Sequence, residues 1–94
     1  IYVDLENGVT QSKVINKLNN FYKKENFFNI LKPNSLLSTN DVINTNDCFI
    51  SVCKTKVKNK IIILSVLDNL IKGGAGQAIQ NLNMKFNFPI KTAL

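Results

Sequence analysis

The feature that most constrains the fold is a near-continuous apolar run, Ile61 to Leu67, which only Ser65 interrupts. Such a run is far too short to span a membrane, and it is typical of a strand that is covered on both faces. The preceding segment, Cys48 to Thr55, alternates as a strand does, and the polar turn Lys56 to Lys60 joins the two. The sequence therefore predicts an antiparallel hairpin whose second strand lies inside a sheet.

Two further strands are predicted before this hairpin. Ile1 to Leu5 alternates apolar and polar residues, and a turn signal, Asn7-Gly8, follows it. Phe27 to Leu31 is a second short strand, which the following proline stops. The polar segment Leu37 to Asp47 is then a connecting loop, either a plain one or one that faces a substrate.

A helix is predicted between the first two strands. Thr10 or Ser12 is suited to cap it, and its apolar spacing continues to about Lys24. Its expected apolar stripe consists of Val14, Ile15, Leu18, Phe21 and Tyr22. This stripe predicts a helix that packs on a core and exposes its lysine-rich face to solvent.

The apolar run leads into Asp68-Asn69, a glycine-rich turn, "KGGAGQA", and a second helical pattern that Asn87 and Pro89 end. The expected apolar stripe of this helix consists of Ala75, Ala78, Ile79, Leu82 and Phe86. Strand, glycine turn and helix form a layout that brings backbone close to a phosphate-bearing ligand. The turn matches neither a Walker loop nor the dinucleotide fingerprint, however. Glycines that only let the helix start close to the sheet explain the pattern equally well.

The predicted order is β-α-β-β-β-α, an α+β fold with a small mixed or antiparallel sheet and packed helices. The 94 residues correspond to one small domain, or to part of a larger one, without internal repeats or a linker. The chain begins at Ile1, inside an expected strand and without an initiator methionine, which suggests a piece of a longer protein.

Residues for self-sufficient catalysis are missing. The chain has no histidine, which excludes Ser-His and Cys-His nucleophile pairs and a Cys/His metal site within it. Cys48 and Cys53 lie five positions apart in a strand, hence on opposite faces, so we expect no disulfide between them. We expect both to be small hydrophobic core residues, no catalytic or metal-binding residue, and a cytoplasmic location.

The net charge of +6 comes entirely from twelve lysines, without any arginine. Nucleic-acid-binding proteins usually rely on arginine for bidentate contacts, so we do not expect nucleic acid as a partner. No signal peptide or membrane span is visible either. Lys72, just before the glycines, is a candidate phosphate ligand, although a solvated side chain is the ordinary expectation there.

Ser65 to Asn83, "SVLDNLIKGGAGQAIQNLN", resembles the C-terminal signature of the N-acetyl-γ-glutamyl-phosphate reductases. The chain departs from the family pattern at Gly74, where alanine is usual, and at Leu82, where methionine is usual. Upstream, "IYVDL", "FYKKENFFNIL" and "STNDVINTNDCFISV" fit the C-terminal portion of that family in the same order. Aspartate-semialdehyde dehydrogenase, a related family, matches the last third less well.

The resemblance implies an enzyme of arginine biosynthesis that reduces a small acyl phosphate to a semialdehyde and phosphate. In that family a cysteine thiolate attacks the acyl phosphate, and NADPH reduces the resulting thioester. The family's nucleophile lies in a Gly-Cys-(Tyr/Phe)-(Pro/Ala)-Thr setting, and a histidine assists it. Neither Cys48 nor Cys53 has that setting. The resemblance therefore covers only the C-terminal part of the enzyme, which we expect to be inactive alone.

By the same resemblance, residues 1–67 form the rear half of a glyceraldehyde-3-phosphate-dehydrogenase-like catalytic and dimerisation domain. Residues 68–94 form the cofactor-facing turn and the helix that returns to the nucleotide domain. NADPH is bound mainly by the missing N-terminal part. Asn69 holds the nicotinamide carboxamide, Gly73 and Gly74 let the backbone approach the cofactor, and Asp68 caps locally. The implied partners are the N-terminal part of the same enzyme and further copies in a homo-oligomer.

Two other functions remain open on the residues alone. One is a stand-alone, non-catalytic α+β interaction module whose hairpin and helices mediate self-association. The other is a basic nucleic-acid-binding module, whose binding would weaken steeply with salt.

Overall fold

A computed structural model describes all residues from Ile1 to Leu94. The elements are β1 (Tyr2–Asp4), α1 (Gln11–Tyr22), β2 (Phe28–Ile30), η1 (Thr39–Asp41), β3 (Cys48–Lys54), β4 (Lys60–Leu67), η2 (Ile71–Ala75) and α2 (Gly76–Lys85). The predicted order of strands and helices, β-α-β-β-β-α, is confirmed, and so is the small α+β class. Only the short helical turns η1 and η2 add to it.

The four strands form one mixed sheet in the order β1-β4-β3-β2. The hairpin of β3 and β4 is antiparallel, as predicted, with Val52 opposite Ile63. β4 is an internal strand because β1 pairs with its other edge, also antiparallel. β2 runs parallel to β3, which requires the long connection between them to return the chain to the opposite end of the sheet.

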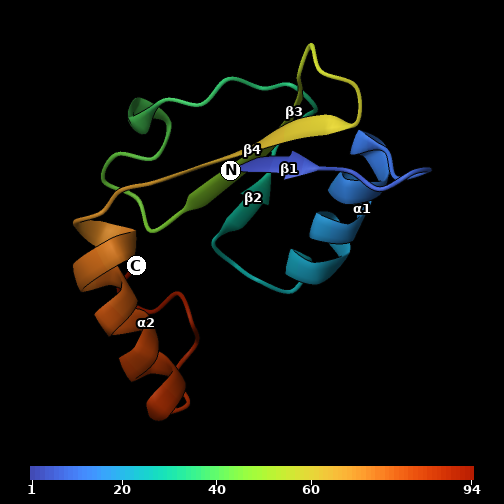
Figure 1. Cartoon of the computed structure of the whole chain (residues 1–94). Helices are drawn as coiled ribbons and strands as arrows, with labels where there is room; N and C mark the ends of the chain where they lie inside the picture. The colour runs from blue at the N-terminus through green and yellow to red at the C-terminus, as the bar shows by residue number, and fades with distance from the viewer.

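Helix α1 covers one face of this sheet (Figure 1). Ile15 of the helix, Val52 of β3 and Ile61 of β4 form the centre of the core on this face. The buried side chain of Gln11 also donates a hydrogen bond of 2.8 Å to the carbonyl of Val52, so the first turn of the helix is tied to the sheet. Burial of these apolar side chains is the main stabilising term of the small fold.

The opposite face of the sheet is only partly covered. The buried hydroxyl of Ser51 donates to the carbonyl of Ser35 at 2.7 Å, which holds the connecting segment against β3. The side chains of Ile62, Leu64 and Val66 on β4 remain half-buried. Tyr2 on β1 is 75 % exposed.

Helix α1 follows its predicted pattern except at its end. Thr10 is the cap, and its hydroxyl accepts the amide of Lys13 at 3.3 Å. Tyr22 stacks on Phe28 with ring centroids 4.5 Å apart, as expected of a core-facing residue. Phe21 was predicted to belong to the same stripe, but it is 74 % exposed. That prediction is wrong because the last turn of the helix places only Tyr22 against β2.

The C-terminal segment differs more from the prediction. Helical structure starts at Ile71, as the wide turn η2, so the glycines lie inside the helical segment and not in a turn before it. Gly74 alone departs from helical backbone angles, with φ −137° and ψ −108°.

The predicted apolar stripe of α2 is mostly exposed: only Ile79 is half-buried, and Leu82 and Phe86 are 50 % and 58 % exposed. The expectation that this stripe joins the core is therefore wrong. Figure 1 shows the reason, because α2 projects away from the sheet and approaches it only near its first turn. The buried residues of this segment are Lys72, Gly76 and Asn83.

The helix ends as predicted, at Asn87, which adopts a left-handed φ of 57°. The amide of Phe88 then bonds the carbonyl of Asn83 at 2.9 Å, which closes the last turn. The side chain of Asn83 donates to the carbonyls of Ile90 and Thr92, and so folds the C-terminal residues back along the helix. None of the helices has the length and hydropathy that crossing a membrane requires.

Both cysteines are free thiols. Cys48 is buried, as predicted, and its sulfur lies 3.4 Å from the hydroxyl of Ser65. Cys53 is half-buried at the other end of β3.

Candidate functional site

The carboxylate of Asp68 organises the end of β4. It accepts three backbone hydrogen bonds: from the amide of Asn44 at 2.9 Å, from Leu70 at 2.8 Å and from Ile71 at 3.2 Å. Asn44 adopts a left-handed φ of 60°, which asparagine tolerates and which belongs to the tight loop before β3. Asp68 therefore caps the helical segment, as expected, and also joins it to a loop that is distant in sequence.

These hydrogen bonds perturb the acid–base behaviour of the site. The amide of Asn44 lowers the pKa of Asp68 below its ordinary value of 3.8; desolvation opposes this, and the amides of Leu70 and Ile71 lower the pKa further. Asp68 is thus an anion at neutral pH. The amides of Leu70 and Ile71 are also the donors that a phosphate at this helix end would need. Asp68 occupies them, so this end of the helix does not form a phosphate site.

Asn69, the predicted carboxamide ligand, is exposed directly beside Asp68. Its side-chain oxygen lies against Gly73, where a Cβ atom would collide with it. Gly73 is therefore needed for the close approach of the asparagine side chain to the helical turn. Gly74 is also exposed, and its nearest neighbour would be the carbonyl of Asn69 at 3.3 Å from an added Cβ.

A pocket of about 370 Å³ opens beside Asn69. Its lining combines Asp68 and Asn69 with Thr39, Ile43, Asn44, Leu67 and Leu70. The structure thus brings Asn69 together with Asp68, Asn44 and apolar side chains. Gly73 and Gly74 do not line this pocket, although they belong to the same turn.

The donor set indicates which ligand chemistry the pocket suits. A primary amide both donates and accepts hydrogen bonds, so Asn69 can pair with a carboxamide. The apolar side chains of Leu67, Leu70 and Ile43 offer contact to a flat ring. The Asp68 carboxylate disfavours a phosphate at the same place. The residues therefore fit the nicotinamide end of a dinucleotide and not its phosphate end.

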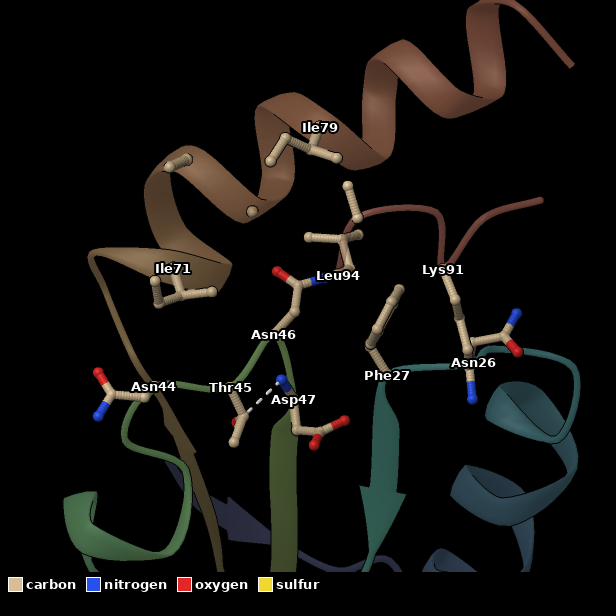
Figure 2. A pocket seen from close by; sticks show the side chains of 13 residues that line it. Asn26, Phe27, Asn44, Thr45, Asn46, Asp47, Ile71, Ile79, Lys91 and Leu94 are labelled. Carbon is tan, nitrogen blue, oxygen red and sulfur yellow. Dashed lines mark hydrogen bonds between the residues drawn. The ribbon is translucent and has the colours of Figure 1, made fainter. Parts of the chain in front are cut away.

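A larger cavity, about 560 Å³, lies between the segment before β3 and the C-terminal helix. In Figure 2, Asn46 points from that segment toward the helix, where Ile71 and Ile79 lie. The side-chain amide of Asn46 donates to Gln80 at 3.2 Å, while its buried oxygen has no hydrogen-bond partner. That oxygen and the carbonyl of Ile71 lie where a Cβ on Gly76 would be, so a larger residue would force the Asn46 side chain or the helix to shift.

Lys72 is not solvated, contrary to expectation, but only 7 % exposed. Its ammonium group donates to Gln80 at 2.8 Å and to Gln77 at 3.2 Å. It also lies 5.3 Å from the ring centres of both Phe27 and Phe28. The sequence signal that could have indicated this is the pair of glutamines five and eight positions after the lysine, but the aromatic partners come from a distant segment at the start of β2.

Comparisons with known proteins place these observations in a family. The family model described as "Semialdehyde dehydrogenase, dimerisation domain" matches residues 1–69. The N-acetyl-gamma-glutamyl-phosphate reductase of Ehrlichia chaffeensis is 43% identical over 94 residues, which is 100% of this chain and 27% of that protein. The probable chloroplastic reductase of the same name from Oryza sativa subsp. japonica is 37% identical, over 100% of this chain and 23% of that protein.

The chain therefore spans about a quarter of the length of the curated relatives it matches. The same relation holds for the reductase of Thermoanaerobacter pseudethanolicus, at 38% identity and 27% of its length. The resemblance carried by Ser65 to Asn83 is thus confirmed over the whole chain.

Proposed function

Because the chain belongs to the semialdehyde dehydrogenase dimerisation-domain family, we propose that it is the C-terminal part of an N-acetyl-γ-glutamyl-phosphate reductase. In this proposal the complete enzyme is an NADPH-dependent oxidoreductase of arginine biosynthesis. It converts an acyl phosphate to a semialdehyde and phosphate. The identity of the relatives over the whole chain supports this choice over an unrelated interaction module.

The chain itself supplies no nucleophile or general base in this reaction. It has no histidine, and Cys48 is buried within a strand, where nothing exposes its thiol to a substrate. Its contribution is a wall of the active site. NADPH, when bound, supplies the hydride, and most of its contacts belong to the N-terminal part of the enzyme.

Asn69 carries the proposed cofactor contact. Its amide holds the nicotinamide carboxamide, and Gly73 and Gly74 allow the close approach of the backbone. The observation that supports this role is the exposed Asn69 amide at a pocket with apolar walls, held against Gly73. Asp68 keeps the turn in place and takes no part in proton transfer.

The two parts of the chain have different proposed surroundings. Residues 1–67 are the rear half of a glyceraldehyde-3-phosphate-dehydrogenase-like catalytic and dimerisation domain. A second copy packs on the outer face of the sheet, the face opposite α1. Residues 68–94 return to the nucleotide domain, which covers the exposed stripe of α2. The free thiols of Cys48 and Cys53 fit a reducing compartment such as the cytoplasm.

The test is the affinity for NADPH of the reductase that contains this chain. We expect Asn69→Ala to raise the dissociation constant about 10-fold, the effect of losing about 1.4 kcal/mol of hydrogen bonding. Asn19→Ala, an exposed asparagine on α1, is the matched control. Equal affinity in the two variants contradicts the role of Asn69.

A second measurement addresses the activity itself. The 94-residue chain alone should neither reduce the acyl phosphate nor bind NADPH tightly. Turnover by the isolated chain would contradict the proposed division of labour. The reading frame upstream of Ile1 distinguishes the alternative of an independent interaction module, because the reductase requires a Gly-Cys-Tyr-Pro-Thr-like motif there.

A further inference from the structure

Lys72 is the only charged residue buried in the chain. No carboxylate pairs with it, since the single ion pair of the structure joins Lys60 to Asp4. The ammonium group is instead surrounded by two neutral glutamine oxygens and two aromatic rings. This environment supplies acceptors for two of its three N–H donors and no negative charge.

Stability alone does not account for this arrangement. Burying an ammonium group without a counter-ion carries a large desolvation cost, which neutral hydrogen bonds and cation–π contacts only partly offset. A methionine at position 72 could lie over the same rings of Phe27 and Phe28 without that cost. What methionine could not do is fix the direction of the turn, because it makes no directional hydrogen bonds.

The contacts of Lys72 join three segments. Gln80 Oε1 accepts from Lys72 and also from the side-chain amide of Asn46, in the segment before β3. Phe28 belongs to β2, and Phe27 directly precedes it. The helical turn is therefore fastened at one end by Asp68 and at the other by Lys72. Asn69 lies on the stretch between them, and Gly73 directly follows Lys72.

We propose that Lys72 is a positioning residue, which fixes the helical turn so that Asn69 presents its amide to the cofactor. The ammonium group acts through Gln80 and the two rings on the orientation of residues 69–73. It touches neither substrate nor cofactor. This inference rests on the proposed cofactor contact of Asn69.

The experiment compares Lys72→Met and Lys72→Arg in the reductase that contains this chain. Lys85→Met, at an exposed lysine at the end of α2, is the matched control. For Lys72→Met we expect about 10-fold faster amide hydrogen exchange in residues 69–76 and a similar rise in the NADPH dissociation constant, because the turn is no longer fixed. Lys72→Arg should restore most of both, since it keeps the charge and the donors.

The thermal midpoint separates positioning from general damage. Lys72→Met should unfold close to the temperature of the unchanged protein, because its apolar stem still packs on the rings. If it does not fold, Gln77→Ala removes one of the two acceptors and should produce a smaller change in the same direction. Unchanged hydrogen exchange in a folded Lys72→Met overturns the proposal.

The two variants distinguish a wrong positioning role for Lys72 from a wrong cofactor contact for Asn69. If Asn69→Ala weakens NADPH binding while Lys72→Met changes neither exchange nor affinity, the positioning role is wrong and the cofactor contact holds. If Lys72→Met accelerates exchange while neither variant changes NADPH affinity, Asn69 does not contact the cofactor. In that case the role of Lys72 is limited to ordering the turn.

Discussion

One carboxylate, that of Asp68, accepts hydrogen bonds from its own turn and from Asn44, which lies 24 residues earlier in the chain. At the scale of a single residue this is the most connected group of the candidate site. Its bonds to Leu70 and Ile71 start the helical segment, and its bond to Asn44 holds the loop before β3. Protonation of this one group therefore weakens the helix start and the loop together.

A pH dependence of stability follows. The pKa of Asp68 lies below its ordinary value of 3.8 in the folded state, so the unfolded chain binds the proton more readily. The stabilisation is therefore fully present above about pH 4 and is lost as the pH falls through the lower, folded pKa. We expect Asp68→Asn to flatten this part of the curve, as measured by urea unfolding at a series of pH values.

The matched control for this prediction is Glu6→Gln, which changes an exposed carboxylate away from the site. It should keep the acid-side loss of stability. The same steep loss in Asp68→Asn as in the unchanged chain would show that other groups cause it.

At the scale of elements, α2 is fastened to the rest of the fold mainly through its first turn. Gly76 is the point of closest approach, because an added Cβ would collide with the Asn46 side chain and lie 2.8 Å from the carbonyl of Ile71. The backbone at Gly76 is ordinary helix, with φ −63°, so the glycine is needed for space and not for its dihedral freedom.

Gly76→Ala should accordingly destabilise the chain by about 1–3 kcal/mol, the usual cost of overpacking a close contact. Ala78→Leu is the control in the same helix, since it adds apolar volume at an exposed position that packs on nothing. Denaturant unfolding of the two variants measures the difference. Equal losses for both would mean that Asn46 moves aside freely.

The elements themselves were largely predictable from local pattern. The hairpin of β3 and β4 was found because apolar alternation and a lysine-rich turn are local signals. The sequence predicted a mixed or antiparallel sheet but not that β2 pairs with β3 in parallel. The residue pattern of a short strand does not indicate its direction relative to a neighbouring strand. The exposed stripe of α2 was misjudged because amphipathic spacing shows that a face is apolar, not that this chain covers it.

The candidate site was predictable only in part, for a similar reason. The capping role of Asp68 follows from neighbours two and three positions along the chain. Its bond to Asn44 and the burial of Lys72 between Phe27 and Phe28 depend on distant segments. The spacing of apolar residues within one segment does not indicate contacts between segments that are distant in sequence. Asn69 was identified through the family pattern and not from its spacing.

At the scale of the whole molecule, the fold is elongated, with extents of 46 × 25 × 17 Å. Two apolar surfaces are not fully covered: the face of the sheet opposite α1, where Ile62, Leu64 and Val66 are half-buried, and the exposed stripe of α2. Exposed apolar area of this kind is typical of protein interfaces. It supports the proposal that this chain is one part of a larger protein that associates through these surfaces.

Self-association through the sheet should therefore be sensitive to charge. Leu64→Lys places an ammonium on the outer face of β4, so we expect it to weaken association at least about 10-fold, because a buried unpaired charge is costly. Phe21→Lys, at a side chain of α1 that is 74 % exposed and lies on the other side of the sheet, is the control. Sedimentation velocity over a concentration series measures both. Equal association of the two variants would place the interface elsewhere.

The pairing of β1 with β4 also dictates the order in which the chain can fold. Tyr2 lies opposite Ile62, so these strands meet only after a loop of nearly the whole sheet-forming region has closed. The hairpin of β3 and β4, by contrast, closes locally and can form first. During synthesis, β1 leaves the ribosome before β4 and has no partner in this sheet until β4 follows. We therefore expect the pairing of β1 with β4 to form after the hairpin, as the step that completes this side of the sheet.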